Sequence, residues 1–217
     1  MMLSINRSKD QARRYYDRIS WFYEVLTTSE KGIIQQGIEM LAVHPGERML
    51  EVGCGPGTGL RLIMETTPAI ENLVGIDLSR KMLLQSRQKQ ISPYPHHIQG
   101  DGAHLPLMHD TFDVLFSAFT LELFSEEEIH LVLSECSRVL KPGGRLGIVS
   151  LAGSPRTISV RLYELAHQLF PVAIDCRPIP LVDLIEKNGF YIQTAEKTLN
   201  WGLPVMITLS TKCNLNQ

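Results

Sequence analysis

The sequence predicts an α/β fold built on a mostly parallel sheet. Short β-rich runs alternate with amphipathic helical stretches, and a glycine-rich segment joins the first β-rich run to the helix that follows it. Helices between successive strands imply right-handed crossovers, and therefore parallel neighbouring strands. At 217 residues, with 44% hydrophobic and 20% charged residues, the chain suits one domain that buries its own core.

The first two thirds of the chain supply most of the expected elements. Strands are expected over 48–52, 73–77, 97–99, 112–116 and 145–151. Helices are expected over 8–27 and 31–43, from Thr58, from Arg80, and from Ser125 to about Leu140. Ser125 with Glu128 three residues later is a capping-box pattern, and Ser79 is a plausible N-cap. The segment 141–144, Lys-Pro-Gly-Gly, is expected to end the last of these helices.

The last third of the chain departs from this alternation. Helices are expected over 157–170 and 180–188, and strands near 190–196 and 205–211. The connection of about 197–204 is short, so the last two strands are expected to be antiparallel.

Composition excludes several classes of partner. A net charge of −2 argues against duplex nucleic acid. The cysteines show no CxxC pair, so reduced thiols are expected rather than a metal site or a disulfide framework; they are Cys54, Cys136, Cys176 and Cys213. No apolar run is long enough for a membrane span, and the N-terminus lacks a signal-peptide core, which together predict a cytoplasmic protein.

The strongest local pattern is the loop after the first expected strand. Glycines occupy positions 53, 55, 57 and 59, directly after the acid Glu51 and before a helix. Glycine lets backbone approach a ligand closely, and helix N-terminal amides offer hydrogen-bond donors. The alternatives are a tight turn without ligand and a dinucleotide site. The spacing differs from Gly-x-Gly-x-x-Gly, and Glu51 would repel phosphates but suits a cationic, phosphate-free ligand.

Two further acids follow expected strands. Asp77 ends the second strand, where an acid can accept both hydroxyls of a ribose. Asp101 follows the third strand, where it can accept a hydrogen bond from an exocyclic amine such as that of adenine. Either residue alone could equally be a polar turn residue, but with the glycine loop they indicate a nucleoside-containing ligand.

These motifs together resemble those of class I S-adenosylmethionine-dependent methyltransferases. The resemblance covers about residues 46–152, in the motifs 51–59, 74–79, 100–106, 112–114 and 138–144. Segments 16–23, 180–190 and 202–205 are similar to the group related to ubiquinone and menaquinone biosynthesis methyltransferases. The resemblance implies a Rossmann-like single domain with a seven-stranded sheet of order 3-2-1-4-5-7-6, the seventh strand antiparallel, and helices on both faces.

The resemblance also implies roles by position. S-adenosylmethionine, released as S-adenosylhomocysteine, would lie with its methionine part beside the glycines, its ribose on Asp77 and its adenine near Asp101. The implied cofactor-binding set is Glu51, Gly53, Cys54, Gly55, Gly57, Asp77, Leu78, Met82, Asp101, Gly102, Ala103 and Phe119. The chain divides into N-terminal helices with a lid (1–45), a cofactor-binding core (46–152), and a C-terminal part with an acceptor cap (153–217).

Catalytic candidates follow from the need to align an acceptor and exclude water. Tyr16 and Tyr23 share a helix face and either form a lid over the cofactor or pack ordinarily. His167 is a candidate base, or a solvated helix residue. Many relatives carry a histidine where Leu121-Glu122-Leu123 stands here, so Glu122 either takes over a polar role or the site lacks that histidine.

The sequence therefore predicts a methyltransferase acting on a small, apolar or aromatic acceptor. Quinone-precursor-like C-methylation and O- or N-methylation of a lipid or secondary metabolite both remain open. The alternatives are a catalytically silent partner protein that binds the cofactor and, less favoured by the loop spacing, a dinucleotide-dependent oxidoreductase. A lipid-like acceptor would imply peripheral membrane contact, and the oligomeric state cannot be predicted.

Overall fold

The structure is a computed structural model that describes residues 8–68, 70, 72–89, 95–152 and 177–213, with backbone only for 21–28. Its strands are β1 (Arg48–Val52), β2 (Asn72–Asp77), β3 (His96–Gln99), β4 (Phe112–Ala118), β5 (Leu140–Leu151), β6 (Phe190–Asn200) and β7 (Leu203–Lys212). Its α-helices are α1 (Lys9–Thr27), α2 (Lys31–Leu41), α3 (Thr58–Thr66), α4 (Arg80–Lys89), α5 (Glu126–Val139) and α7 (Leu181–Lys187). Two 3₁₀ turns are η1 (Thr28–Glu30) and η2 (Leu121–Leu123).

The sheet has the predicted order, β3-β2-β1-β4-β5-β7-β6. Strands β1 to β5 are mutually parallel, whereas β7 lies antiparallel between β5 and β6. The predicted fold class and strand order are therefore confirmed. The chain crosses from β3 at one edge to β4 beside β1, so the order reverses between β1 and β4, and the carboxyl ends of these strands meet at one edge of the sheet.

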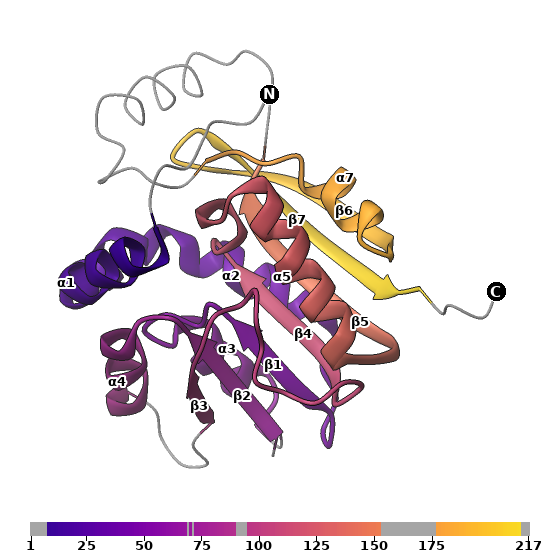
Figure 1. Cartoon of the computed structure of the whole chain (residues 1–217), viewed down its shortest axis with the longest axis horizontal. Helices are drawn as coiled ribbons and strands as arrows, with labels where there is room; N and C mark the ends of the chain where they lie inside the picture. The colour runs from indigo at the N-terminus through magenta and orange to yellow at the C-terminus, as the bar shows by residue number, and fades with distance from the viewer. Residues whose placement is uncertain (1–7, 69, 71, 90–94, 153–176, 214–217) are drawn as a thin grey trace.

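Helices cover both faces of the sheet (Figure 1), so its central strands are buried on both sides. Leu50 and Leu115 face the layer of α5 and α7, and their neighbours Met49 and Phe116 face the layer of α2 and α3. The alternation along each strand thus assigns successive apolar side chains to two separate cores. The remaining long helix, α1, packs against α4 beyond the edge formed by β3.

Two boundaries differ from the sequence prediction. The segment 141–144 is not a loop between the helix and the strand but part of the strand itself. Helix α5 ends at Val139, and β5 begins at Leu140, which pairs with Phe112 of β4. The ladder between β4 and β5 shifts register after that pair, and this irregularity accommodates the Pro-Gly-Gly segment inside the strand. Pairing with β4 therefore overrides the local preference for a loop.

The connection predicted over 197–204 between the last two strands is also wrong, because the strands themselves cover most of that segment. The strands β6 and β7 extend to meet at a two-residue turn formed by Trp201 and Gly202, with φ of 52° and 75°. Two positive φ values are typical of a type I′ hairpin turn, whose twist matches that of the strands it joins. The predicted antiparallel pairing is confirmed.

Other predictions made from the sequence are not tested by the fold. The helix expected over 157–170 lies outside the described residues. The division into 1–45, 46–152 and 153–217 stays a prediction. None of the helices in the described parts of the chain is long and apolar enough to cross a membrane.

The predicted capping box at the start of α5 is present. The Ser125 hydroxyl accepts a hydrogen bond from the Glu128 amide (3.2 Å), and the Ser125 amide donates to Glu128 Oε2 (3.0 Å). We expect Ser125→Ala to lower the free energy of unfolding by about 1 kcal/mol, because it leaves an amide of the first turn without its acceptor. Urea unfolding measures the change. Ser125→Asp retains a capping oxygen and should keep most of the stability; equal losses in both variants would contradict the capping role.

Candidate active site

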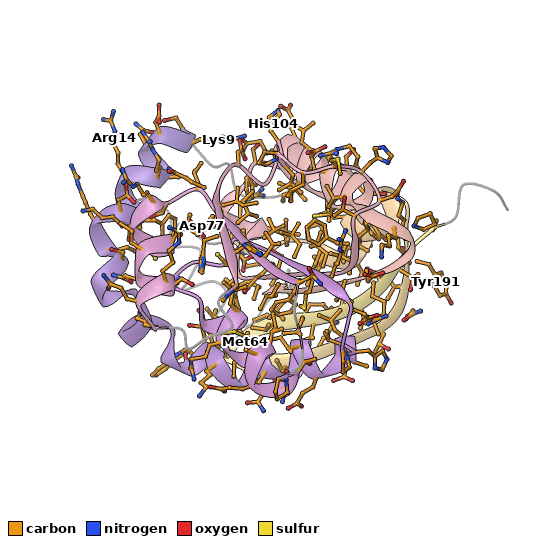
Figure 2. All side chains as sticks on the ribbon, turned by 90° about the horizontal axis from the view of Figure 1, so that it is seen from below. Lys9, Arg14, Met64, Asp77, His104 and Tyr191 are labelled. Carbon is orange, nitrogen blue, oxygen red and sulfur yellow. The ribbon has the colours of Figure 1, made fainter. Side chains whose placement is uncertain are left out.

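One cavity opens at the carboxyl ends of β1, β2 and β4, with α1 and the η1–α2 junction on its other side. It encloses about 1190 Å³ of empty space, including the part open to solvent. Figure 2 shows Asp77 in the interior and Lys9 directed inward from α1, whereas Arg14 projects outward from the same helix. The cavity thus lies at the point where the strand order reverses, the usual ligand site of open α/β sheets.

Asp77 ties together two loops that line the cavity. Its Oδ2 accepts a hydrogen bond from the Gly55 amide (2.8 Å) and its Oδ1 from the Ser79 amide (2.7 Å). Burial nevertheless raises the pKa of Asp77 to about 6, against the effect of these two hydrogen bonds. A carboxylate has about four acceptor positions, so Asp77 retains the capacity to accept bonds from a ligand.

Glu51 is buried at the base of the cavity. Its Oε2 is a buried oxygen without a hydrogen-bond partner in the described structure. Burial, together with the charge of Asp77, raises the pKa of Glu51 well above its ordinary value. A Cβ on Gly59 would lie 2.0 Å from Glu51 Oε1, so only glycine leaves room for this carboxyl group. An unpartnered oxygen of this kind can accept a hydrogen bond from a cationic ligand group.

The glycine loop is held tightly against the neighbouring strands. The amides of Gly53 and Cys54 both donate to the Ile76 carbonyl of β2, at 2.8 and 3.1 Å. A Cβ on Gly53 would lie 2.2 Å from Thr120 Oγ1, so the loop also meets the end of β4 closely. Burial raises the pKa of the Cys54 thiol well above its ordinary value, which leaves it a neutral and poor nucleophile.

Asp101 is paired with a lysine that was not predicted from the sequence. Its Oδ1 accepts a hydrogen bond from the Ala103 amide (2.9 Å), and its Oδ2 lies 2.5 Å from Lys9 Nζ. Lys9 also lies 3.4 Å from Glu128 Oε1. Partial burial is the largest single influence and acts to raise the pKa of Asp101, but the hydrogen bonds from Lys9 and the Ala103 amide, together with the charge of Lys9, lower it by more. Asp101 is therefore ionised at neutral pH.

The position of α1 depends on a contact with the N-terminus of α4. Asp17 Oδ1 accepts hydrogen bonds from the Ser79 hydroxyl (2.6 Å) and the Lys81 amide (3.2 Å). Ser79 Oγ in turn accepts from the Met82 amide (3.2 Å), which confirms Ser79 as a capping residue. This contact places Tyr16 of α1 in the lining of the cavity.

A second pair of acids lies at the β4–β5 end of the cavity. Glu30 lines the cavity; burial, together with the negative charge of Glu122, raises its pKa to about 8. Glu122 itself is fully buried outside the lining, where its carboxyl accepts hydrogen bonds from the Ser150 hydroxyl (3.0 Å) and the Leu151 amide (3.2 Å). Glu122 therefore acts on the cavity through its charge rather than by lining it.

The structure brings most of the predicted cofactor-binding residues to one cavity. Those that line it are Glu51, Gly53, Cys54, Gly55, Asp77, Leu78, Met82, Asp101, Gly102 and Phe119. Gly57, the N-cap of α3 with φ of 85°, and Ala103, which is buried, are not part of the lining. His167 and the side chain of Tyr23 lie outside what the structure describes. The roles of all these residues in binding and catalysis remain predictions.

Comparisons with known proteins agree with this architecture. Residues 50–148 match a family model described as a methyltransferase domain. A demethylmenaquinone methyltransferase of Thermotoga maritima is 34% identical over 154 residues, which cover 67% of this chain and 63% of that protein. The chain spans less than two thirds of the length of the curated relatives it matches.

Two solved structures share the fold at low sequence identity. A methyltransferase of Haloferax volcanii, solved in complex with a methyltransferase activator, has a TM-score of 0.80 at 16% identity, over 94% of this chain and 99% of that chain. Magnesium protoporphyrin IX methyltransferase of Synechocystis, solved with bound S-adenosylhomocysteine, has a TM-score of 0.74 at 18% identity, over 94% and 99%.

Residues 50–148 match the methyltransferase domain, and the sheet has the strand order of the class I methyltransferases, the class whose cofactor is S-adenosylmethionine. Within this class, the chain is related to the ubiquinone and menaquinone biosynthesis methyltransferases. The recognition made from the sequence is therefore confirmed, as is the cofactor of the class.

The space beside Glu51 predicts a contrast between two helical glycines. A Cβ on Gly59 would collide with the buried Glu51 carboxyl, whereas a Cβ on Gly32 of α2 would meet nothing within 4 Å. We expect Gly59→Ala to lower the free energy of unfolding by about 1–3 kcal/mol through overpacking. Gly32→Ala should raise it by up to about 1 kcal/mol. Urea unfolding of both variants checks this, and an equal gain in both would contradict the contact with Glu51.

The raised pKa of Glu30 predicts a pH dependence of stability. The folded state favours the protonated carboxyl, with a pKa near 8 against an ordinary value of 4.5. This contribution to stability is complete below pH 4.5 and is lost as the pH rises through 8. We therefore expect the Tm of the wild type to fall relative to that of Glu30→Gln between pH 5 and pH 9. Glu186→Gln, on the exposed side of α7, should track the wild type. Parallel curves for wild type and Glu30→Gln would refute the assignment.

Proposed function

We propose that this protein transfers a methyl group from S-adenosylmethionine to a small, apolar or aromatic acceptor. The observation that carries the proposal is the unpartnered, buried Oε2 of Glu51, which lies in the same cavity as Asp77 and Asp101. Three acids around one cavity suit a phosphate-free ligand with a cationic end and a nucleoside end. S-adenosylmethionine supplies a methyl group already activated for displacement by its attachment to a sulfonium.

Acids of the cavity would accept hydrogen bonds from both ends of this cofactor, the nucleoside end and the methionine end. Asp77, already fixed by two amides, would accept the ribose hydroxyls, and Asp101 with Gly102 would border the adenine. Gly53 and Glu51 would face the methionine part, with the orphaned oxygen of Glu51 accepting from the ammonium group. The raised pKa of Glu51 fits a carboxyl that lacks its counter-charge until a cation binds.

Apolar and aromatic side chains would exclude water from the transfer. Tyr16 lines the cavity from α1, and we keep it as the candidate lid residue. Ile34, Phe119 and Phe124 supply apolar walls toward the end of β4. Since a sulfonium methyl group needs little further activation, alignment and desolvation are the main contributions the protein must make.

The acceptor is inferred from chemistry and from relatives. The apolar wall formed by Ile34, Phe119 and Phe124 favours an aromatic acceptor, and the similarity to a demethylmenaquinone methyltransferase favours a quinone precursor that is methylated on carbon. O- or N-methylation of a lipid or secondary metabolite is the second possibility. A cytoplasmic location stays a prediction, as do the candidate base His167 and the second lid residue Tyr23.

Calorimetric titration with S-adenosylmethionine, S-adenosylhomocysteine and NADH tests the cofactor. We expect saturable binding of the two adenosyl ligands alone, and a loss of about tenfold or more in affinity in Asp77→Ala, because the ribose and the loop amides lose a charged acceptor. The affinity should also fall as the pH drops below about 6, where Asp77 becomes protonated.

Controls separate this proposal from its alternatives. Asp183→Ala removes an exposed acid on α7, outside the cavity lining, and should bind as the wild type does. Binding of NADH alone would contradict the proposal and favour a dinucleotide-dependent enzyme. Cofactor binding without release of S-adenosylhomocysteine, across a panel of phenolic, quinol and amine acceptors, would favour the silent partner protein.

A further inference from the structure

The cavity has two chemically different ends. At one end, Asp77 and Asp101 are engaged by backbone amides and by Lys9. At the other end, beyond β4, Glu30 faces into a region bordered by Ile34 and Phe119. The first end matches the predicted cofactor residues, and the second contains an acid to which the cofactor assignment gives no task.

We propose that Glu30 recognises the acceptor, by accepting a hydrogen bond from a phenolic or enolic hydroxyl group at the β4–β5 end of the cavity. This inference rests on the proposed methyltransferase function and narrows its substrate class to apolar molecules that carry an acidic hydroxyl group.

The surroundings of Glu30 fit one polar contact on an otherwise apolar molecule. Ile34, one turn further along the chain, is buried, and Phe119 beyond β4 is buried as well. Ala118 and Thr120 complete this end of the cavity. Small-molecule sites typically combine such apolar walls with a few polar groups that fix orientation, and Glu30 is the carboxyl group that occupies this position.

The charges that face Glu30 leave its carboxyl strongly basic. Glu122, from η2, adds a negative charge, and Arg177 lies near Glu122, with its Nη2 donating to the Phe124 carbonyl. Across the cavity stand Glu51 of β1 and, on α1, residues Lys9, Arg13 and Tyr16. Within the described parts of the chain, Glu30 takes part in no ion pair, so burial and Glu122 together raise its pKa to about 8.

A carboxylate of this basicity is a suitable proton acceptor for an acidic hydroxyl group. In the transfer step the acceptor's O–H bond breaks, the proton goes to a Glu30 oxygen, and the electron pair stays on the acceptor oxygen. The acceptor then carries the negative charge that attack on a methyl group requires. Glu30 returns the proton to solvent after product leaves.

A hydrogen bond from a distant part of the chain reaches the residue before Glu30. The indole Nε1 of Trp201, at the turn between β6 and β7, donates to the hydroxyl of Ser29 at 2.6 Å. Ser29 directly precedes Glu30 in η1. The turn between β6 and β7 therefore lies beside η1, although the indole ring of Trp201 is largely exposed.

The test measures binding of a matched pair of probes to the protein saturated with S-adenosylhomocysteine. The probes are 1-naphthol and 1-methoxynaphthalene, in which a methyl group replaces the hydroxyl proton and removes the hydrogen-bond donor. At pH 8.5, where Glu30 is mostly ionised, we expect the wild type to prefer 1-naphthol by about tenfold, the effect of one hydrogen bond to a charged acceptor. Glu30→Leu should abolish the preference. With Glu30→Gln, the affinity for 1-naphthol should lose the rise that the wild type shows between pH 6.5 and pH 8.5.

Three measurements keep the inference separate from the cofactor proposal. S-adenosylhomocysteine affinity should be unchanged in both Glu30 variants, and Glu186→Leu should match the wild type in every respect. A preference for 1-naphthol that persists in Glu30→Leu, or no preference in the wild type, would overturn the inference while leaving cofactor binding intact. Loss of S-adenosylhomocysteine affinity in Glu30→Gln, with a Tm no lower than that of the wild type, would instead assign Glu30 to the cofactor. Failure of the wild type to bind S-adenosylhomocysteine refutes the proposed function itself.

Discussion

The arrangement of the site depends on the carboxyl group of Asp77. It accepts a hydrogen bond from the Gly55 amide, in the loop after β1, and another from the Ser79 amide, in the turn after β2. Two loops that belong to different βα units therefore share one acceptor. Ser79 then carries the arrangement outward, since its hydroxyl caps α4 and donates to Asp17 of α1. One carboxylate thus links the glycine loop to the helix on the other side of the cavity, and the burial of that carboxylate is tolerated because amides satisfy it.

The acids of the cavity illustrate how burial and pairing give similar residues different properties. Asp101, beside Lys9, is held ionised, whereas burial and a neighbouring acid raise the pKa values of Glu51 and of the half-buried Glu30. Neither of these two residues forms an ion pair within the parts of the chain that the structure describes. Burying carboxyl groups with incomplete hydrogen bonding lowers the free energy of unfolding. Such costs are concentrated at functional sites, where a ligand supplies the missing partner.

Local sequence patterns were sufficient to place the glycine loop and Asp77 in the cavity, but they did not predict Lys9 and Glu30. The glycine loop and Asp77 lie directly after strands, so their positions follow from the parallel sheet alone. Lys9 reaches the cavity because Asp17 fixes α1 on α4, and Glu30 reaches it because α2 packs on the sheet. No periodicity reveals these tertiary contacts. The extension of β5 through the Pro-Gly-Gly segment was missed for the same reason, since pairing of Leu140 with β4 decided it.

The hydrogen bond between Trp201 and Ser29 also has a consequence for the order of folding. It joins residues 172 positions apart, so its formation closes nearly the whole chain into a loop. The entropic cost of closing a loop grows with its length, and contacts of this kind form only after shorter-range pairings have drawn the chain together. The wall of the cavity around Glu30 is therefore completed late, after the parallel core of the sheet has assembled.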